Sequence, residues 1–239
     1  MGHSKSANIA TLRAVKAARL TRAEQKERTR IALLDAALRL LERKSFGSLG
    51  LREVAREAGV VPTAFYRHFE SMEELGLVLI DDSFRTLRRM IRDARSEPLA
   101  YGDVIRSSVE ILVRHVHAHR LHFRFVARER SSGVPVLRQA IRAEIRLFSS
   151  ELATDLARFP YLDRWSTEDL GMFATLIVNT MVSTAEEIVE APSGRPEAER
   201  EIVRRAEKQL RLIAFGVPVW RSEGAAAPDA GDGEPAAPT

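Results

Sequence analysis

The sequence predicts an all-α fold, in which an N-terminal helix-turn-helix domain of three helices precedes a larger helical domain. Apolar residues recur at spacings of three and four along most of the 239-residue chain, which is the period of an amphipathic helix. No segment alternates apolar and polar residues as a half-buried strand does, and no internal repeat is present. Gly59 and Pro62 separate two short helical patterns, which indicates a tight turn between helices.

Composition limits the class of protein. With 45% hydrophobic residues, the chain can bury the core of one large domain or of two smaller ones. It contains no cysteine, which excludes disulfides and thiolate metal sites. It has neither a run of about 18 apolar residues nor an apolar N-terminal signal segment. We therefore expect a cytoplasmic protein that does not enter a membrane.

Positive charge is concentrated near the N-terminus. Residues 1–70 hold 14 Lys and Arg against 7 Asp and Glu, although the whole chain has a net charge of only +4. This asymmetry indicates a surface that binds nucleic acid. Residues 1–20 are expected to form a basic flexible arm, since they contain no acidic residue. The arm either enters a DNA minor groove or is a solvated extension that attracts phosphates without specificity.

The first domain is expected to span residues 21–70 and to begin with a capped helix. Thr21 and Glu24 form a capping-box sequence, in which each side chain accepts a hydrogen bond from the other residue's backbone amide. The helix should continue to about Lys44. Its buried stripe is predicted to consist of Ile31, Leu34, Leu38 and Leu41.

Two short helices hinged at a glycine are predicted between residues 51 and 69. Gly59 is the expected end of the first helix, because glycine enters the left-handed region without a side-chain clash. Pro62 suits the first position of the second helix, where a missing amide hydrogen costs nothing. Phe65 and Phe69 would anchor this helix to the core. The apolar stripe of the first helix consists of Leu51, Val54, Ala55 and Ala58.

The outward residues of these helices suit the major groove and the phosphates of DNA. Arg67 is the best candidate for reading a base, because a guanidinium can contact guanine O6 and N7 together. Arg52, on the first helix of the pair, is a second candidate. The alternative for both arginines is a solvated surface position. The full predicted DNA-binding set is Arg52, Thr63, Ala64, Tyr66, Arg67 and His68.

The block Phe65-Tyr66-Arg67-His68-Phe69 resembles the end of the helix-turn-helix in the TetR family of bacterial repressors, whose signature is Phe-Tyr-x-x-Phe. The whole stretch from Leu51 to Phe69, followed by Glu73-Glu74-Leu75-Gly76-Leu77, is most similar to the FabR/DesT branch, which represses unsaturated fatty-acid synthesis genes and senses acyl-CoA. The resemblance implies a homodimer that binds double-stranded DNA. It also implies that the helix after the motif transmits a ligand signal.

Three positions depart from the family pattern. Gly50 stands where the family usually has Thr or Ser, and it supplies no oxygen to cap the next helix or to touch a phosphate. Val61 and Ala64 also stand where many relatives carry a hydroxyl group. We therefore expect the phosphate contacts to fall on other residues, namely Thr63, Tyr66 and His68.

The second domain, residues 71–221, is predicted to bind an effector and to dimerise. It begins with a second capping box at Ser71 and a long helix that reaches about Arg95, before Pro98 breaks the chain. In the next helical segment, His115, His119 and His122 share one face at a spacing that suits a metal. No cysteine or carboxylate lies beside them in the sequence, so we expect no metal.

Aromatic and arginine residues alternate between residues 123 and 133, and this run again resembles the FabR/DesT branch. An acyl-CoA needs an apolar tunnel for its chain and cations for its phosphates. The ligand-binding candidates are therefore Phe123, Arg124, Arg128 and Arg130. Alternatively, Phe123 and Val126 belong to the core, and the arginines pair with Glu129 or with solvent. A later stripe of Arg138, Arg142 and Arg146 is interpreted as a solvated face rather than as a row of phosphate ligands.

Two C-terminal helices are predicted to form the dimer interface. The helix at residues 166–189 has an apolar stripe wider than one partner helix requires, and the last helix should run to about Trp220. Two such helices from each subunit can make a four-helix interface. Burial within one subunit is the alternative. Residues 222–239 contain four acidic residues and no basic one, and are expected to be a disordered tail.

These patterns favour a DNA-binding transcriptional repressor of fatty-acid or lipid genes. It would bind a palindromic operator as a homodimer and respond to a fatty acyl-CoA. A drug or another small apolar effector is the alternative. An acyl-binding carrier, a cryptic enzyme and an architectural DNA-compacting protein also remain open. No glycine-rich phosphate loop or nucleophile elbow occurs, so we predict no catalytic residue, no cofactor and no metal.

Overall fold

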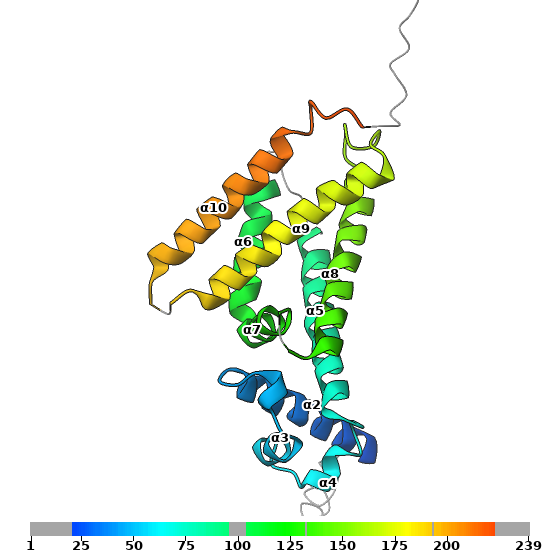
Figure 1. Ribbon diagram of the computed structural model, residues 1–239, viewed down its shortest axis with the longest axis vertical. Helices are drawn as coiled ribbons and strands as arrows, with labels where there is room; N and C mark the ends of the chain where they lie inside the picture. The colour runs from blue at the N-terminus through cyan, green and yellow to red at the C-terminus, as the bar shows by residue number, and fades with distance from the viewer. Residues whose placement is uncertain (1–20, 96–103, 132, 193, 223–239) are drawn as a thin grey trace, which may run out of the picture. The chain divides into compact units, whose positions relative to one another are not determined.

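A computed structural model describes residues 21–95, 104–131, 133–192 and 194–222. All regular secondary structure in these ranges is helical, which confirms the predicted all-α class (Figure 1). The chain divides into two compact units. The first contains the residues up to 87 together with 121–141, and the second contains 88–120 and the residues from 142 onward. The predicted arm, the break at Pro98 and residues 223–239 of the predicted tail lie outside the described residues.

The helices of the two units follow the chain in a mixed order. The first unit contains α2 (Arg22–Leu41), the 3-10 helix η1 (Phe46–Ser48), α3 (Leu51–Glu57), α4 (Pro62–Phe65), the first part of α5 (Met72–Arg95), most of α7 (Arg120–Glu129) and the start of α8 (Pro135–Leu156). The second unit contains the remainder of α5 and α8 with α6 (Val104–Ala118), α9 (Thr167–Glu190) and α10 (Pro196–Phe215).

α2 begins at the predicted capping box. The Thr21 hydroxyl accepts a hydrogen bond from the Glu24 amide at 3.2 Å, and the Glu24 carboxylate accepts one from the Thr21 amide at 2.7 Å. The predicted stripe is wrong at Ile31, which is 48% exposed. Leu33 and Ala37 are buried as well as the three predicted leucines, and they rotate the centre of the buried face away from Ile31.

The turn between α3 and α4 forms as predicted at Gly59, whose φ is +70°. The Gly59 amide donates to the Arg56 carbonyl at 3.1 Å, and the Val60 amide donates to the Ala55 carbonyl at 2.9 Å. These two bonds make a Schellman motif, which satisfies the last carbonyls of α3. The turn therefore fixes the direction in which the next helix leaves.

α4 is a single helical turn that is anchored by its aromatic residues. Pro62 occupies its first turn, as predicted. Phe65 and Phe69 are 0% and 2% exposed, which confirms both as anchors, and their ring centroids are 5.5 Å apart. The guanidinium of Arg30, from α2, lies over the Phe69 ring at 5.9 Å. Packing on α2 and α3 thus holds a helix too short to be stable alone.

The start of α5 follows the predicted capping box only in part. The Ser71 hydroxyl accepts a hydrogen bond from the Glu74 amide at 3.1 Å, as expected for a cap. The Glu74 carboxylate, however, accepts from the amide of Glu70 rather than from that of Ser71. The reciprocal half of the box is therefore shifted by one residue, because the chain between α4 and α5 brings the Glu70 amide within reach.

Arg128 joins α7 to the end of α2. Its guanidinium Nη1 donates to the carbonyl oxygens of Leu41 at 2.9 Å and of Lys44 at 3.0 Å. The Leu41 carbonyl is one of the last acceptors of α2, and the Lys44 carbonyl lies in the turn that follows. A cation at this end also suits the negative pole of the α2 dipole. Arg128 therefore adds to the C-cap at Glu42, whose amide bonds the Arg39 and Leu40 carbonyls.

A buried cluster around η1 completes the first unit. Glu129 is fully buried, and its Oε1 accepts a hydrogen bond from the Phe46 amide at 3.1 Å. The Phe125 ring, 2% exposed, lies 6.3 Å from the Phe46 ring. A Cβ added to Gly76 would come within 2.8 Å of both the Phe46 ring and the Leu137 side chain. Only a glycine lets α5 approach this closely.

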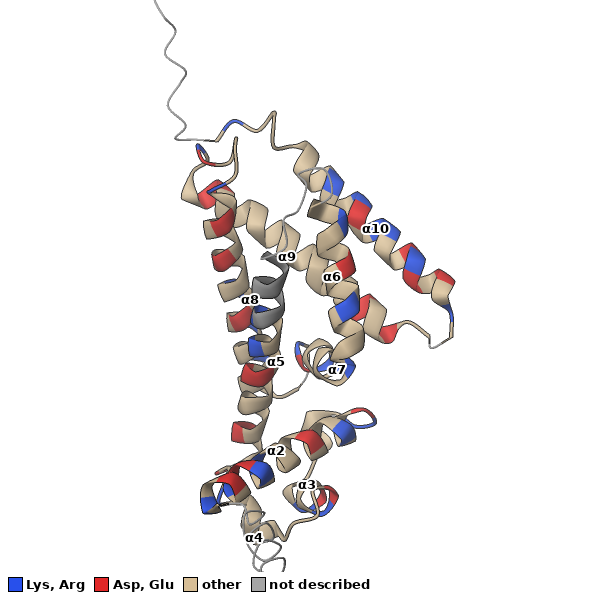
Figure 2. Ribbon diagram, turned by 180° about the vertical axis from the view of Figure 1, so that it is seen from behind, with Lys and Arg blue, Asp and Glu red and all other residues tan. Residues whose placement is uncertain are grey.

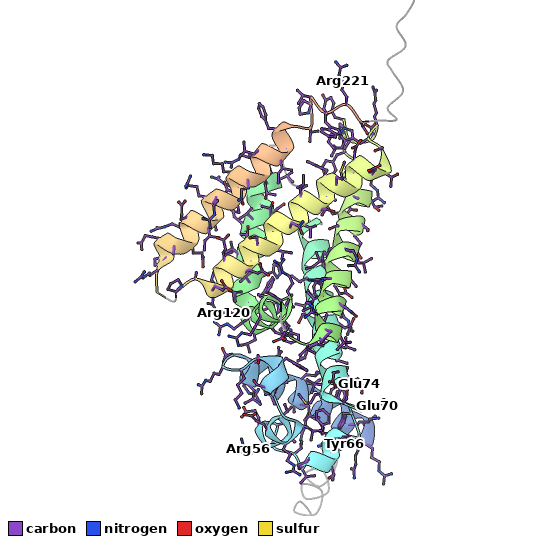
Figure 3. All side chains as sticks on the ribbon, in the orientation of Figure 1. Arg56, Tyr66, Glu70, Glu74, Arg120 and Arg221 are labelled. Atoms are coloured by element: carbon purple, nitrogen blue, oxygen red, sulfur yellow. The ribbon has the colours of Figure 1, made fainter. Side chains whose placement is uncertain are left out.

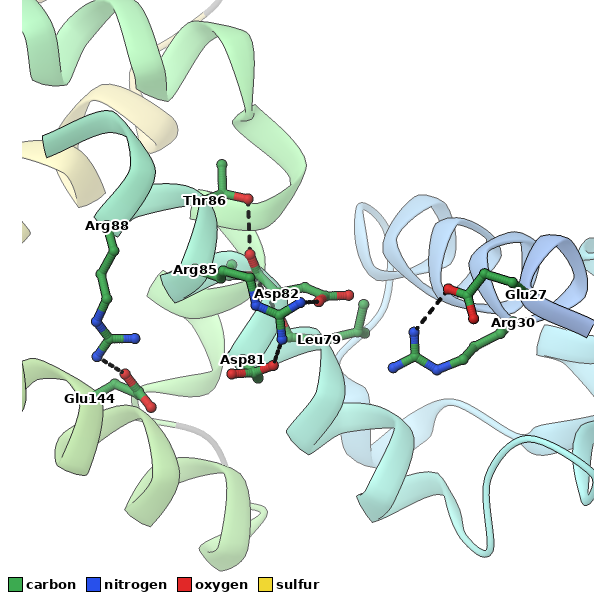
Figure 4. Close-up of polar contacts among 10 residues, drawn as sticks. Glu27, Arg30, Leu79, Asp81, Asp82, Arg85, Thr86, Arg88 and Glu144 are labelled. Atoms are coloured by element: carbon green, nitrogen blue, oxygen red, sulfur yellow. Dashed lines mark hydrogen bonds and ion pairs between the residues drawn. The ribbon is translucent and has the colours of Figure 1, made fainter. Parts of the chain in front are cut away.

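The second unit has its core among α6, α9 and α10. One buried cluster consists of Val109, Ala206 and Leu210, with Ile177, Met181 and Val203 packed against it. Arg88 joins α5 to α8 within this unit (Figure 4). Its Nη2 lies 2.6 Å from Glu144 Oε2, and its Nε lies 3.3 Å from Glu151 Oε1. These pairs bring a charge-assisted contact to the α5–α8 seam.

α9 starts where predicted, and the Ser166 hydroxyl caps it by accepting a hydrogen bond from the Asp169 amide at 3.1 Å. The Ser222 hydroxyl donates to the Asp169 carboxylate and accepts from the Ser166 amide at 2.7 Å. The hydrogen bond from Ser222, together with that from Ser166, lowers the pKa of Asp169.

Among the described residues, α9 is the one helix that is long and apolar enough to cross a membrane by length and composition. The core helix of a soluble protein can have the same length and composition.

Candidate nucleic-acid interface

The α3–α4 surface presents most of the predicted DNA-binding residues to solvent. Arg52 on α3, Thr63 on α4 and Arg67 after α4 are exposed. Tyr66, the C-cap of α4, is 64% exposed and stands at this surface in Figure 3. Its ring meets the buried Phe65 ring edge-on at 5.9 Å, which holds the phenol in place. Ala64 is half-buried and contributes less surface.

The cations of this surface are available for an anionic partner. Within the described ranges, neither Arg52 nor Arg67 pairs with an acidic group. The two glutamates of α3 are already paired: Glu57 with Arg39 at 3.0 Å, and Glu53 with Lys44 at 2.7 Å. Figure 2 shows Lys and Arg along α2 and α3, interspersed with acidic residues. The unpaired arginines can therefore bind phosphates or base edges.

His68 is half-buried at the end of this surface. Its Nδ1 is buried and has no hydrogen-bond partner among the residues that the structure describes. Burial lowers the pKa of His68, and the positive charges of Lys26 and Arg30 lower it further. The ring therefore favours its neutral form, in which one of its two nitrogens carries a proton that can be donated.

Two cations on α2 were not predicted as part of the interface. Lys26 and Arg30 lie close enough to His68 for their charges to act on its imidazole. Arg30 also pairs with Glu27 at 3.5 Å (Figure 4). The sequence does contain a signal, because Arg22, Lys26 and Arg30 recur every four residues along one face of α2.

The position of Arg67 bears on its predicted role. α4 ends at Phe65, so Arg67 lies just beyond the C-cap of the helix. In helix-turn-helix proteins, base edges are contacted mainly by the N-terminal residues of the second helix. Arg67 as a base reader stays a prediction.

The four predicted ligand-binding residues lie in different surroundings. Phe123 and Arg124 are half-buried on α7, and Arg124 Nη1 is 3.7 Å from Glu42 Oε1. Arg128 donates to the two carbonyls at the end of α2, and Arg130 is half-buried after α7. The aromatic residue of α7 that is fully buried is Phe125.

The predicted histidine face forms a ring stack rather than a metal site. His115 and His119 have ring centroids 6.2 Å apart, and His122 Nδ1 is 2.9 Å from Ser83 Oγ. In the described part of the chain, no group of three His, Asp or Glu residues is placed to hold a metal ion.

The second unit exposes large apolar residues on α9 and α10. Met172 and Leu176 on α9 are 48% and 53% exposed, and Leu212 and Phe215 on α10 are 67% and 82% exposed. The last helix was predicted to run to about Trp220, but it ends at Phe215. The Gly216 amide donates a hydrogen bond to the Ile213 carbonyl and closes the helix there. A single chain thus leaves much of these apolar side chains in contact with solvent.

A three-helix head with exposed cations on α3–α4 and a separate helical unit define a DNA-binding protein of the helix-turn-helix class. Comparison with known families agrees with this. Residues 33–77 match the model of bacterial regulatory proteins of the tetR family, and residues 101–217 match the tetracyclin repressor-like C-terminal domain. The two models together match more than half of the chain. The chain belongs to the TetR family of transcriptional regulators.

Solved structures share the fold. The fatty acid degradation regulator FadR from Bacillus halodurans is 14% identical, with a TM-score of 0.62, and the match covers 79% of this chain and 95% of that one. FadR from Bacillus subtilis in complex with stearoyl-CoA is 16% identical, with a TM-score of 0.59, over 78% and 98%. A TetR-like regulator from Rhodococcus sp. RHA1 is 19% identical, with a TM-score of 0.58, over 85% and 100%.

Proposed function

We propose that this protein is a homodimeric repressor of fatty-acid or lipid metabolism genes, which acts in the cytoplasm and releases or binds its operator according to the level of a fatty acyl-CoA. The observation that carries the DNA-binding part is that Arg52, on α3, and Arg67, after α4, are exposed and have no acidic partner among the described residues. The FabR/DesT-like sequence at residues 51–77 and the acyl-CoA in the related FadR structure support the lipid part.

The proposed roles fall on the side chains of α3, of α4 and of the residues that follow α4. Arg52 and Arg67 contact DNA, Arg67 with a base, while Tyr66 and Thr63 donate hydroxyl hydrogen bonds to phosphates. His68 donates from its neutral ring, and Ala64 lets the helix backbone approach the groove.

The effector part of the proposal places an acyl-CoA against α7. Phe123 would contact the acyl chain, and Arg124 and Arg130 would contact the phosphates. Arg128, at the same helix, holds the Leu41 and Lys44 carbonyls of the DNA-binding head. A ligand that moves α7 would thus act on α2 through Arg128, provided that it binds the DNA-competent and DNA-incompetent conformations with different affinity.

The base-reading role is tested with Arg67→Ala and an operator selected from random DNA. We expect the variant to lose about 5- to 150-fold in affinity for the operator, the range for one base contact, and much less for unrelated DNA. Measurement is by fluorescence anisotropy at fixed salt. Equal losses on both DNAs would show that Arg67 contacts only phosphate.

The effector is tested by adding stearoyl-CoA or an unsaturated acyl-CoA to the operator complex. We expect one of them to change the operator affinity at least tenfold, and free CoA to leave it unchanged. If no acyl-CoA has an effect, mass spectrometry of ligand that co-purifies with the protein identifies the alternative, a drug-like or other small apolar molecule. That result would contradict the lipid part alone and leave DNA binding standing.

A further inference from the structure

Val61, in the turn between α3 and α4, is 65% exposed. Its neighbour Val60 is half-buried, and the Val60 amide is fixed by its hydrogen bond to the Ala55 carbonyl. The backbone at Val61 is extended, with φ −73° and ψ 147°. Val61 thus presents its side chain to solvent directly before α4, next to a backbone amide that is already fixed.

Nothing in the described part of the chain favours an apolar residue at this position. Val61 is the residue before α4, where Ser, Thr, Asp or Asn would accept a hydrogen bond from the helix amides, and it makes no such bond. Thr21 and Ser166 do cap α2 and α9 with their hydroxyl groups. The valine therefore provides no capping hydrogen bond to α4, and most of its own side chain remains exposed.

The surroundings of Val61 are those of the proposed DNA interface. It directly precedes Pro62, the first residue of α4, and lies two residues before the exposed Thr63. On this surface Tyr66 is the other large apolar residue with comparable exposure, at 64%. Tyr66 carries a hydroxyl that can meet a phosphate, whereas Val61 offers only methyl groups. Single exposed valines are common on protein surfaces, and this one stands at the start of the second helix of the helix-turn-helix.

We propose that Val61 reads thymine in the operator, by contact with the C5-methyl group in the major groove. This proposal rests on the DNA binding proposed above for the α3–α4 surface. Residues at the start of a recognition helix contact base edges, and the thymine methyl is the apolar group that distinguishes one base there. A hydroxyl at this position would favour a phosphate or a polar base edge. The valine therefore directs the specificity of this chain toward thymine.

The test replaces the thymines of the selected operator by deoxyuridine, one position at a time. Deoxyuridine lacks only the C5-methyl group. We expect wild-type protein to lose about fourfold in affinity per half-site at one particular thymine, and about sixteenfold when both half-sites are changed. The other thymines should give smaller changes. Binding is measured by fluorescence anisotropy at constant salt.

Val61→Ser gives the matched protein change. Serine removes both methyl groups and supplies a cap for α4, so the melting temperature should be equal to or higher than that of wild type. This variant should bind the thymine and deoxyuridine operators with equal affinity. Val136→Ser, at a valine of α8 that is 36% exposed, is the control and should keep the full discrimination.

Two results would overturn the proposal while leaving DNA binding intact. In one, the protein binds its selected operator but no deoxyuridine substitution weakens the complex. In the other, Val61→Ser discriminates as strongly as wild type. A protein that selects no sequence at all would instead contradict the DNA-binding function, and with it the role of Val61.

Discussion

Among single residues, His68 and Glu129 show how neighbouring groups determine what a buried ionisable side chain of the first unit does. His68 lies close to Lys26 and Arg30, while its Nδ1 is buried without a partner in the described part of the chain. Glu129 is buried too, but one of its oxygens accepts the Phe46 amide. His68 therefore favours its neutral form. Glu129 accepts a hydrogen bond from a backbone amide that would otherwise have no acceptor.

His68 makes stability depend on pH. Burial, followed by the charges of Lys26 and Arg30, lowers its pKa in the folded protein below the usual value. The unfolded chain therefore binds the proton more readily, so this contribution to stability is present above about pH 6.5 and is lost as the pH falls. We expect the melting temperature of His68→Gln to fall less than that of wild type when the pH is lowered from 7.5 to 5.5. Parallel decreases in calorimetric scans would show that His68 is not responsible.

Glu129 should stabilise the first unit through its hydrogen bond. Glu129→Ala leaves the buried Phe46 amide without an acceptor, and we expect a loss of about 1–3 kcal/mol in the free energy of unfolding. Glu129→Gln keeps a carbonyl acceptor and should lose less. Glu201→Ala, which removes an exposed partner of Arg204, is the control and should leave the urea midpoint unchanged. An equal loss for alanine and glutamine would contradict the role of the hydrogen bond.

Among the helices, local signals in the sequence predicted several caps and turns. The Thr21 cap, the Gly59 turn and Pro62 all depend on residues a few positions apart, and all three were predicted. The predicted capping box at Ser71 formed only in part. The prediction that Ile31 is buried was wrong, because contacts with other helices, and not the helical period alone, determine which face of α2 is buried.

The contacts of α7 with α2 and η1 join residues more than 80 positions apart. No periodic pattern carries such information, so the sequence did not predict that α7 belongs to the compact unit of the head. The same limit applies to Lys26 and Arg30, whose proximity to His68 depends on how α2 packs beside α4.

The close approach of α5 to η1 depends on Gly76. Gly76→Ala would gain helix propensity but place a Cβ 2.7 Å from the Phe46 ring, and we expect a net loss of about 1–3 kcal/mol in stability. Gly171→Ala, inside α9, is the control, because a Cβ there meets nothing within 4 Å, and its helix propensity should leave stability unchanged or raise it by up to about 1 kcal/mol. Urea unfolding that showed Gly76→Ala to be more stable than wild type would contradict this packing.

At the scale of the whole molecule, the account requires two copies of the chain. Leu212 and Phe215 expose apolar side chains that a partner copy would cover. We expect Leu212→Glu combined with Phe215→Glu to convert a dimer into monomers, as measured by sedimentation velocity. Glu207→Ala, on the same helix, should remain dimeric. A double variant that sediments as a dimer would place the interface elsewhere.

Selection of bound sequences from random double-stranded DNA tests the central claim most directly. A dimer with two α4 helices is expected to enrich an inverted repeat whose half-sites are centred about 34 Å, or one helical turn, apart, each containing a recurring thymine. Enrichment of no sequence, or of a single unpaired half-site, would contradict a dimeric regulator that reads its operator through the α3–α4 surface.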